Sequence, residues 1–438
     1  MRRKERGAVR SPRAPQGGAS GGRRRAARSA RAVFAAALAL MALLSAAAPV
    51  RAQSRLVVVS VLNGALQVYE WDGSEIHSRV LAQEGVVRPS IAPSGDAVAY
   101  THSVGDFRQT SLWLADLTED PLPPRLLVDA PALPPADPAR QIGQFIWSAA
   151  GDALYFNTTL GLGIETRPQN DLWRVDVRTA HVTPLLASGE GGNMSPAPNS
   201  VWLALIAPGR YGDIPAQVAF YNTQTAEHVS ALRYEAVSSG SELPWYPSVR
   251  WLPDGSGVRL AVPPPDWLYG KGEGVVLWEL RPGDEARQLG MVEADFFGLP
   301  RFSPDGERIL YVQRRTAPQQ NTWTLTVAAA DGSDAAEYIR GPLLFGSLRW
   351  LPQGERFFYA LSDAPRTLWL GQVGYPPLRF PASDVPISAL TWADAETFVY
   401  LSESDGRYTL AFATLGAPDE TTPIATLENR PLFDALRP

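Results

Sequence analysis

The chain of 438 residues is 45% hydrophobic and 19% charged, a balance typical of a globular protein, and it contains no cysteine. Disulfides, thiolate metal sites and cysteine nucleophiles are therefore excluded. The formal net charge of −5 is unevenly distributed, because residues 1–52 hold 12 Arg or Lys and one Glu, which leaves 28 basic and 44 acidic residues, or −16, in residues 53–438. Such a charge argues against nucleic acid or an anionic membrane surface as a partner.

The first 52 residues have the pattern of a secretory signal peptide. A basic arm is followed by an apolar run over residues 32–48 and then by Pro49-Val50-Arg51-Ala52, a small-residue cleavage pattern. We expect cleavage after Ala52, an extracytoplasmic location (periplasmic, cell-surface or secreted) and no membrane insertion of the mature chain. The alternative, an uncleaved anchor, needs about 20 apolar residues, and this run is shorter.

After the signal, a motif recurs that consists of an apolar strand, a tight turn, a second apolar strand and, after a loop, a third strand that often contains Leu-Trp. The seven copies begin at residues 88–95, 145–151, 194–199, 249–255, 300–306, 348–354 and 390–394. Their turn residues are 40 to 56 positions apart, and a period near fifty with four short strands is typical of a propeller blade. We therefore expect an all-β fold in which residues 53–438 form a single β-propeller domain of four-stranded blades.

The two ends of the chain predict how the ring closes. Residues 55–61, 65–71 and 75–81 look like the second, third and fourth strands of a blade that lacks its first strand, and residues 429–436 lie one period beyond Asp394. Pairing of the N- and C-terminal strands would complete this blade and leave no open edge. The count is then eight blades, with a seven-bladed ring as the alternative.

The best copies of the motif are Trp251-Leu-Pro-Asp-Gly255 and Phe302-Ser-Pro-Asp-Gly306. This strand-turn-strand pattern resembles the family of TolB-like propellers with WD40-like (PD40) repeats. The resemblance covers nearly all of residues 53–438 and implies a fold, not an activity. The protein that gives the family its name carries an α/β domain before its propeller, whereas here the first strand follows the predicted signal directly, so we expect a propeller alone.

No motif indicates a cofactor, a metal or a catalytic group. The Gly-x-Ser-x-Gly pattern occurs only at residues 18–22, inside the predicted signal, and no glycine-rich phosphate loop follows a strand. The four histidines lie in different blades without metal-ligand spacing. A pair of carboxylates near the central channel is still compatible with the sequence, and Asp213, Glu165 and Asp295 are the candidates for it.

Nine of the 13 tryptophans recur at repeat positions, which predicts packing between blades. Trp245 and Trp267 instead lie in proline-rich connections. In a four-stranded blade the connection between strands two and three emerges on the same face as the connection between blades, and long loops on this face are where binding usually occurs. The predicted binding residues are Trp245, Tyr246, Trp267, Tyr269, Lys271, Asp295 and Phe296. The competing interpretation is that these rings only pack the loops onto the blades.

The sequence therefore favours an exported, noncatalytic β-propeller that serves as a protein- or polymer-binding scaffold in the cell envelope. Its partner would be an envelope protein, a polysaccharide or a peptide, bound by a monomer on the long-loop face without a cofactor. The alternative is a carbohydrate-active hydrolase or lyase that uses carboxylates near the central channel.

Overall fold

The computed structural model describes residues 55–103, 105, 108–118, 122–161, 166–198, 201–241, 243–314, 322–380 and 387–437. Residues 55–438 form one compact unit. The predicted signal peptide at residues 1–52 lies outside the described residues. Within the described part of the chain, no helix has the length and the apolar character that a membrane crossing needs.

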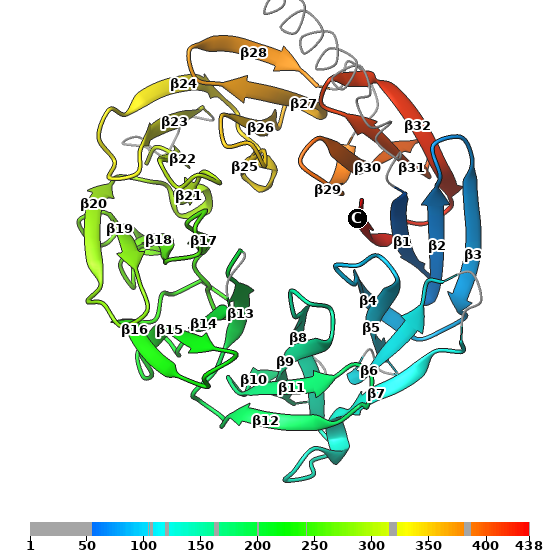
Figure 1. The fold of residues 1–438 in the computed structure, drawn as a ribbon. Coiled ribbons are helices and arrows are strands. Elements are labelled where there is room, and N and C mark those ends of the chain that lie inside the picture. Colours follow the sequence, from blue (N-terminus) through cyan, green and yellow to red (C-terminus); the bar gives the residue numbers. More distant parts are fainter. Residues whose placement is uncertain are drawn as a thin grey trace, which may run out of the picture. The chain divides into compact units, whose positions relative to one another are not determined.

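Eight antiparallel sheets are arranged as a ring, which confirms an eight-bladed β-propeller rather than the seven-bladed alternative (Figure 1). We number the blades in chain order and give their strands from the centre of the ring outward. Blade 1 contains β33 (Leu432–Leu436), β1 (Leu56–Leu62), β2 (Ala65–Trp71) and β3 (Ile76–Ala82); blade 2 contains β4 (Val86–Ile91), β5 (Ala97–Ser103), β6 (Gln109–Asp116) and β7 (Arg125–Asp129). Blade 3 contains β8 (Arg140–Trp147), β9 (Ala153–Leu160), β11 (Leu172–Asp176) and β12 (Val182–Leu186), with β10 (Arg167–Pro168) as a short addition on β9.

The remaining blades repeat the same order. Blade 4 contains β13 (Asn193–Pro196), β14 (Trp202–Ala207), β15 (Ala216–Asn222) and β16 (His228–Tyr234); blade 5 contains β17 (Arg250–Trp251), β18 (Val258–Val262), β19 (Val275–Leu280) and β20 (Arg287–Val292). Blade 6 contains β21 (Arg301–Phe302), β22 (Arg308–Val312), β23 (Trp323–Ala329) and β24 (Ala336–Gly341). Blade 7 contains β25 (Arg349–Trp350), β26 (Arg356–Leu361), β27 (Ala364–Gln372) and β28 (Tyr375–Arg379); blade 8 contains β29 (Ile387–Trp392), β30 (Thr397–Ser404), β31 (Arg407–Thr414) and β32 (Ala417–Leu427). The helices of the described residues are 3-10 turns: η1 (Ala130–Ala132), η2 (Trp267–Tyr269), η3 (Phe296–Gly298) and η4 (Phe345–Ser347).

The ring is closed as the two ends of the sequence predict. The C-terminal strand β33 pairs antiparallel with the first strand β1, in a register that runs from Val57 opposite Leu436 to Val61 opposite Leu432. The innermost strand of blade 1 therefore comes from the end of the chain, and the other three strands come from its beginning. This pairing leaves no unpaired inner edge on β1 that could template association with another chain.

The recurring glycines are explained by one turn that is used five times. Gly95, Gly151, Gly255, Gly306 and Gly354 all have φ between 69° and 80°, in the left-handed region where a side chain is strained. The amide of each glycine donates to the carbonyl three residues earlier, as Gly306 does to Ser303 at 2.9 Å. This turn joins the first and second strands of blades 2, 3, 5, 6 and 7.

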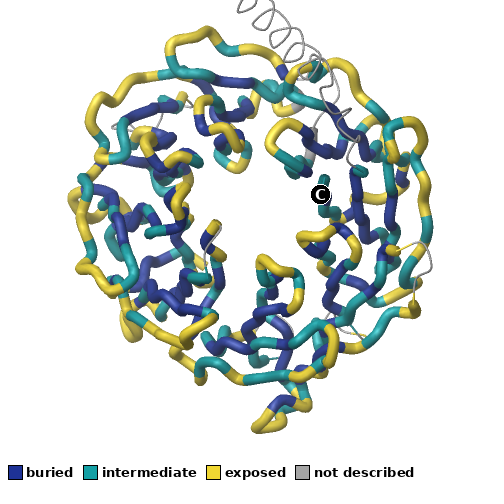
Figure 2. Tube along the Cα trace, in the orientation of Figure 1, coloured by how far each residue is buried: buried dark blue, intermediate teal, exposed yellow. Residues whose placement is uncertain are grey.

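The apolar core consists of eight separate clusters, each between two neighbouring blades. Buried residues follow the blades, whereas exposed residues gather at the turns and on the outer strands (Figure 2). All nine tryptophans at repeat positions belong to these clusters, which confirms their predicted role in packing between blades. Three of them also bridge blades by a hydrogen bond: the indole nitrogens of Trp147, Trp251 and Trp350 donate to carbonyls of the preceding innermost strand, at Ser90 (3.1 Å), Ser195 (3.1 Å) and Arg301 (2.8 Å).

The connection between the second and third strands differs around the ring. In blades 1, 7 and 8 it is a two-residue turn, at residues 63–64, 362–363 and 405–406. In blades 2 to 6 it is longer and reaches its greatest length in blade 5, where residues 263–274 contain η2. Five consecutive blades, 2 to 6, thus carry the long connections, and we call this side of the ring the elaborated face.

The closure can be probed through Asp434 of β33, whose carboxylate accepts hydrogen bonds from the amides of Ile91 (3.0 Å) and Ala435 (2.9 Å). Burial raises the pKa of this carboxyl above its ordinary value of 3.8, although the two hydrogen bonds partly oppose the shift. A carboxyl with a raised folded-state pKa holds its proton more readily in the folded chain than in the unfolded chain. The stability of the protein therefore decreases as this group loses its proton.

We expect the free energy of unfolding of the wild type, relative to Asp434→Asn, to decrease between about pH 4 and pH 7, because Asn never becomes charged. Urea denaturation at several pH values measures this difference, with Asp284→Asn at an exposed turn as the control. A difference between wild type and Asp434→Asn that is independent of pH, or that increases with pH, would contradict the burial of this charge.

Candidate functional site

Three of the seven predicted binding residues, Trp267, Asp295 and Phe296, line one cavity on the elaborated face. Its volume is about 210 Å³, and the residues Leu268, Gly270, Ala294, Phe297, Arg314 and Trp323 complete its lining. These residues come from the long connection of blade 5, the connection between blades 5 and 6, and the corresponding region of blade 6. Aromatic, cationic and acidic side chains therefore meet here, but the cation is Arg314 and not the predicted Lys271.

Trp267 forms the floor of the cavity and not its exposed surface. The side chain belongs to η2 and is only 3% exposed, and its indole nitrogen donates to the carbonyl of Ala294 at 2.9 Å. The guanidinium carbon of Arg314 lies 4.0 Å from the centroid of the Trp267 ring, in a cation–π contact. Glu293 pairs with Arg314 at 3.5 Å and so holds the guanidinium over the ring.

Asp295 has a local structural role that determines how the neighbouring rings are presented. It caps η3, where its carboxylate accepts a hydrogen bond from the amide of Phe297 at 3.1 Å. Within this single turn the rings of Phe296 and Phe297 contact each other edge to face, with their centroids 5.4 Å apart. Phe297 is left 61% exposed beside the cavity.

The rings continue into blade 7. The centroid of Phe345 in η4 lies 6.3 Å from that of Phe297 and 4.7 Å from that of Trp323, the second contact being edge to face. We call Phe296, Phe297, Trp323 and Phe345 the aromatic platform. It joins the cavity over Trp267 to the surface of the next blade as one continuous apolar strip.

Tyr269 and Lys271 lie at the border of this region. Tyr269 ends η2 and is 60% exposed, whereas the ammonium of Lys271 is 3.4 Å from the carboxylate of Asp266. The Tyr211 hydroxyl also donates to Asp266, and this hydrogen bond, together with the charge of Lys271, lowers the pKa of the Asp266 carboxyl. Asp266 therefore stays ionised and ties the connection of blade 4 to that of blade 5.

The structure separates Trp245 and Tyr246 from the other predicted residues. Tyr246 lines a different cavity of about 440 Å³, together with polar side chains of blades 2 to 4 that include Arg88, Gln141 and Asn157. Burial raises the pKa of the Tyr246 hydroxyl to about 12, so it is a neutral hydrogen-bonding group there. Trp245 is half-buried and does not line either cavity.

Of the three carboxylates suggested for catalysis, the two that the structure describes line different cavities. Asp213 lines a third cavity, of about 450 Å³, and pairs with Arg210 at 3.1 Å, whereas Asp295 lines the cavity over Trp267. Glu165 lies outside the described residues. Within the part of the chain that the structure describes, no three His, Asp or Glu side chains are grouped as a metal site would require.

Comparison with known proteins shows the fold and leaves the activity open. No protein-family model matches the chain, and no curated protein matches its sequence. Among solved structures, the chain is similar to prolyl oligopeptidase B from Galerina marginata (13% identity, TM-score 0.52, 78% of this chain and 50% of that one). It is also similar to the dihydro-heme d1 dehydrogenase NirN (14% identity, TM-score 0.51, 87% of this chain and 75% of that one).

A weaker similarity is found to TolB from Acinetobacter baumannii, with 17% identity and a TM-score of 0.32 over 64% of this chain. The chain spans 62% of the length of that protein and half the length of prolyl oligopeptidase B. The chain's own eight sheets define its class, an eight-bladed β-propeller, and the similarities to prolyl oligopeptidase B and NirN concern the fold alone. Membership of the PD40 family stays a prediction from the repeat motif.

The different burial of two neighbouring residues gives a direct test of the site. We expect Trp267→Ala to lower the free energy of unfolding by about 3–5 kcal/mol, because it leaves a cavity under Arg314. Tyr269→Ala, at an exposed position two residues away, should stay within about 0.5 kcal/mol of the wild type. Chemical denaturation measures both, and an equal effect of the two substitutions would show that Trp267 is not the floor of the site.

Proposed function

We propose that the chain is a noncatalytic binding module of the cell envelope that holds a protein partner on its elaborated face. The observation that carries this proposal is the aromatic platform, with Phe297 61% exposed beside a cavity whose floor is Trp267. Aromatic residues and arginine are enriched at protein interfaces, and here exposed aromatic rings lie next to Arg314, which stacks on the buried ring of Trp267.

Other exposed apolar residues on the same face support a protein partner. Besides Phe297 they are Tyr211 (49%), Ile214 (46%), Tyr269 (60%) and Leu344 (42%), all in connections of blades 4 to 7. Large exposed side chains that gather on one face indicate an interaction surface more than isolated ones do.

The proposed location depends on the N-terminal sequence. The basic arm, the apolar run over residues 32–48 and the small-residue pattern ending at Ala52 are the features of export. The absence of cysteine makes the chain independent of the redox state of the compartment.

The geometry gives the enzymatic alternative less support. Asp295 is the cap of η3, and Asp213 is paired with Arg210 in another cavity, so each carboxylate has a structural partner. A glycosidase or lyase of the type considered needs two carboxyl groups across one substrate. The described residues offer no such arrangement for these two acids.

The experiment has two stages. Residues 53–438 are used to capture partners from an envelope extract, and the affinity of the purified partner is then measured by calorimetry. We expect the double variant Phe297→Ala/Tyr269→Ala to lose at least about tenfold in affinity, since truncating interface hot spots costs about 2 kcal/mol or more.

The matched control is Tyr375→Ala/Leu378→Ala, which removes two side chains of similar exposure, 64% and 62%, from the outermost strand of blade 7. This variant should bind like the wild type. Unchanged affinity of Phe297→Ala/Tyr269→Ala would place the interface elsewhere, and equal losses in both variants would show that the binding is nonspecific hydrophobic adhesion.

A further inference from the structure

The innermost strands have a charge opposite to that of the rest of the propeller. These strands are β33, β4, β8, β13, β17, β21, β25 and β29, and they surround the centre of the ring (Figure 1). They carry five basic residues and one acid: Arg88, Arg140, Arg250, Arg301, Arg349 and Asp434. Residues 53–438 as a whole have 28 basic and 44 acidic residues, so positive charge is concentrated at the centre.

Three of these arginines occupy the same repeat position. Arg250, Arg301 and Arg349 each precede their turn glycine by five residues. They lie on β17, β21 and β25, the innermost strands of the consecutive blades 5, 6 and 7. The residue after each of them, Trp251, Phe302 or Trp350, is buried in the wedge between blades and fixes the strand. Equal register in adjacent blades places the three residues at one level of the ring, and we call them the arginine arc.

The charges of the arc are not neutralised within the described protein. Arg301 donates to the carbonyl of Leu348, and Arg349 donates to that of Leu390 at 3.2 Å, each in the next blade. The guanidinium of Arg250 forms neither a hydrogen bond nor an ion pair within the described part of the chain. A carbonyl partner orients a guanidinium, but it leaves the full positive charge in place.

The surroundings of these groups make that charge costly. Desolvation lowers the pKa of all three guanidinium groups, and the charge of Arg349 lowers that of Arg301 further. Arg250 nevertheless has a large exposed surface. Arg250 is thus surrounded by protein but still reached by solvent. An anion bound beside it would offset its unpaired charge.

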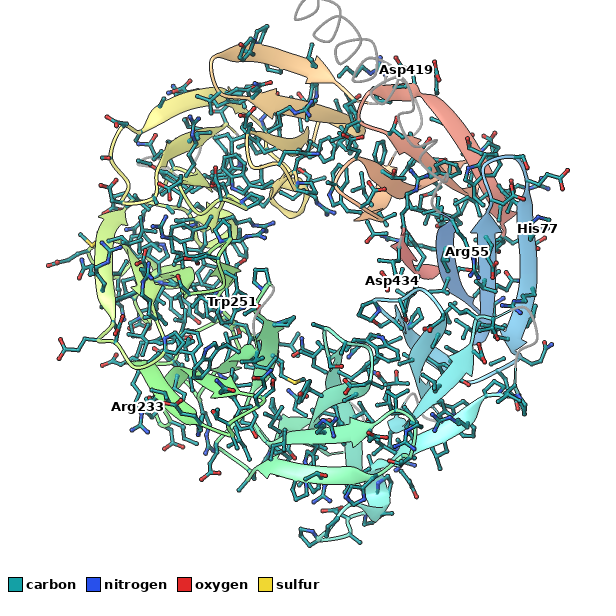
Figure 3. All side chains as sticks on the ribbon, viewed as in Figure 1. Arg55, His77, Arg233, Trp251, Asp419 and Asp434 are labelled. Carbon is teal, nitrogen blue, oxygen red and sulfur yellow. The ribbon has the colours of Figure 1, made fainter. Side chains whose placement is uncertain are left out.

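The other side of the ring supplies hydrogen-bonding groups. Arg88 on β4 donates to the carbonyl of Gly143 at 2.6 Å and lines the cavity of about 440 Å³ with Gln141 and Gln144. Asp434, the single acid of the innermost strands, lies at the inner edge, across the ring from Trp251 (Figure 3), and its carboxylate is turned to the amides of Ile91 and Ala435. It therefore does not neutralise the arc.

We propose that the centre of the ring is a binding site for a small polyanion with several carboxylate or phosphate groups, recognised by Arg250, Arg301 and Arg349. The planar fork of arginine matches both groups in bidentate geometry. Three such forks in adjacent blades favour a multivalent anion over a single carboxylate. The site uses the innermost strands, and none of its three arginines belongs to the aromatic platform.

Calorimetry with citrate and with tripolyphosphate tests the site, using residues 53–438 so that the basic arm is absent. We expect at least one of the two anions to bind, and the preferred one identifies the anionic group. Arg250→Gln/Arg301→Gln/Arg349→Gln should weaken that binding at least about tenfold. The control Arg178→Gln/Arg233→Gln/Arg407→Gln removes the same charge from exposed positions outside the innermost strands, such as Arg233 at the outer edge (Figure 3), and should leave it unchanged.

Arg301 and Arg349 also bridge blades, so the triple variant carries a risk to folding that Arg250→Gln avoids. The single variant loses a guanidinium without a described partner and should fold normally while it weakens binding about threefold or more. The proposal is overturned if neither anion binds at about 1 mM. It is equally overturned if the arc variants bind like the wild type, or if the control variant loses affinity as much as they do.

Discussion

The spacing between neighbouring blades is the constraint on which the rest of the structure depends. Each sheet can bury its two faces only against the sheets beside it, and the eight apolar clusters all lie in these wedges. The indole bonds of Trp147, Trp251 and Trp350 to the preceding blade fix that spacing near the centre. In a closed ring every blade has a neighbour on both sides. The pairing of β33 with β1 completes blade 1 and so closes the ring.

The two proposed surfaces use different parts of the same repeat. The aromatic platform is built from connections, whose length varies between blades without disturbing the wedges. The arginine arc is built from the innermost strands, where the buried aromatic residue after each arginine determines its position. The same rigid scaffold can therefore carry variable connections on the elaborated face and a regular set of arginines at the centre, and the two can bind different ligands.

The fold was predictable because its signals are local and repeated: a left-handed glycine in the first turn of five blades, and a missing strand at one end of the chain matched by an extra strand at the other. The site was only partly predictable. Strand order gives the face on which a connection emerges but not the direction in which it folds, so Tyr246 was grouped with Trp267 although they line different cavities. The sequence analysis missed Phe345. A repeat could have revealed it, because Phe297 and Phe345 are each followed by glycine and each precede an arginine of the arc by four residues.

Native-state hydrogen exchange of β1 and β33 tests the central claim most directly, because it reports whether the ring opens at its closure. Peptides that cover residues 56–62 and 432–436 should exchange together, as slowly as those of the buried strand β5, since the two strands share one ladder and one opening event. If residues 432–436 exchanged much faster than residues 56–62, the terminal strand would open independently. Closure by β33 would then not be the constraint that holds the ring.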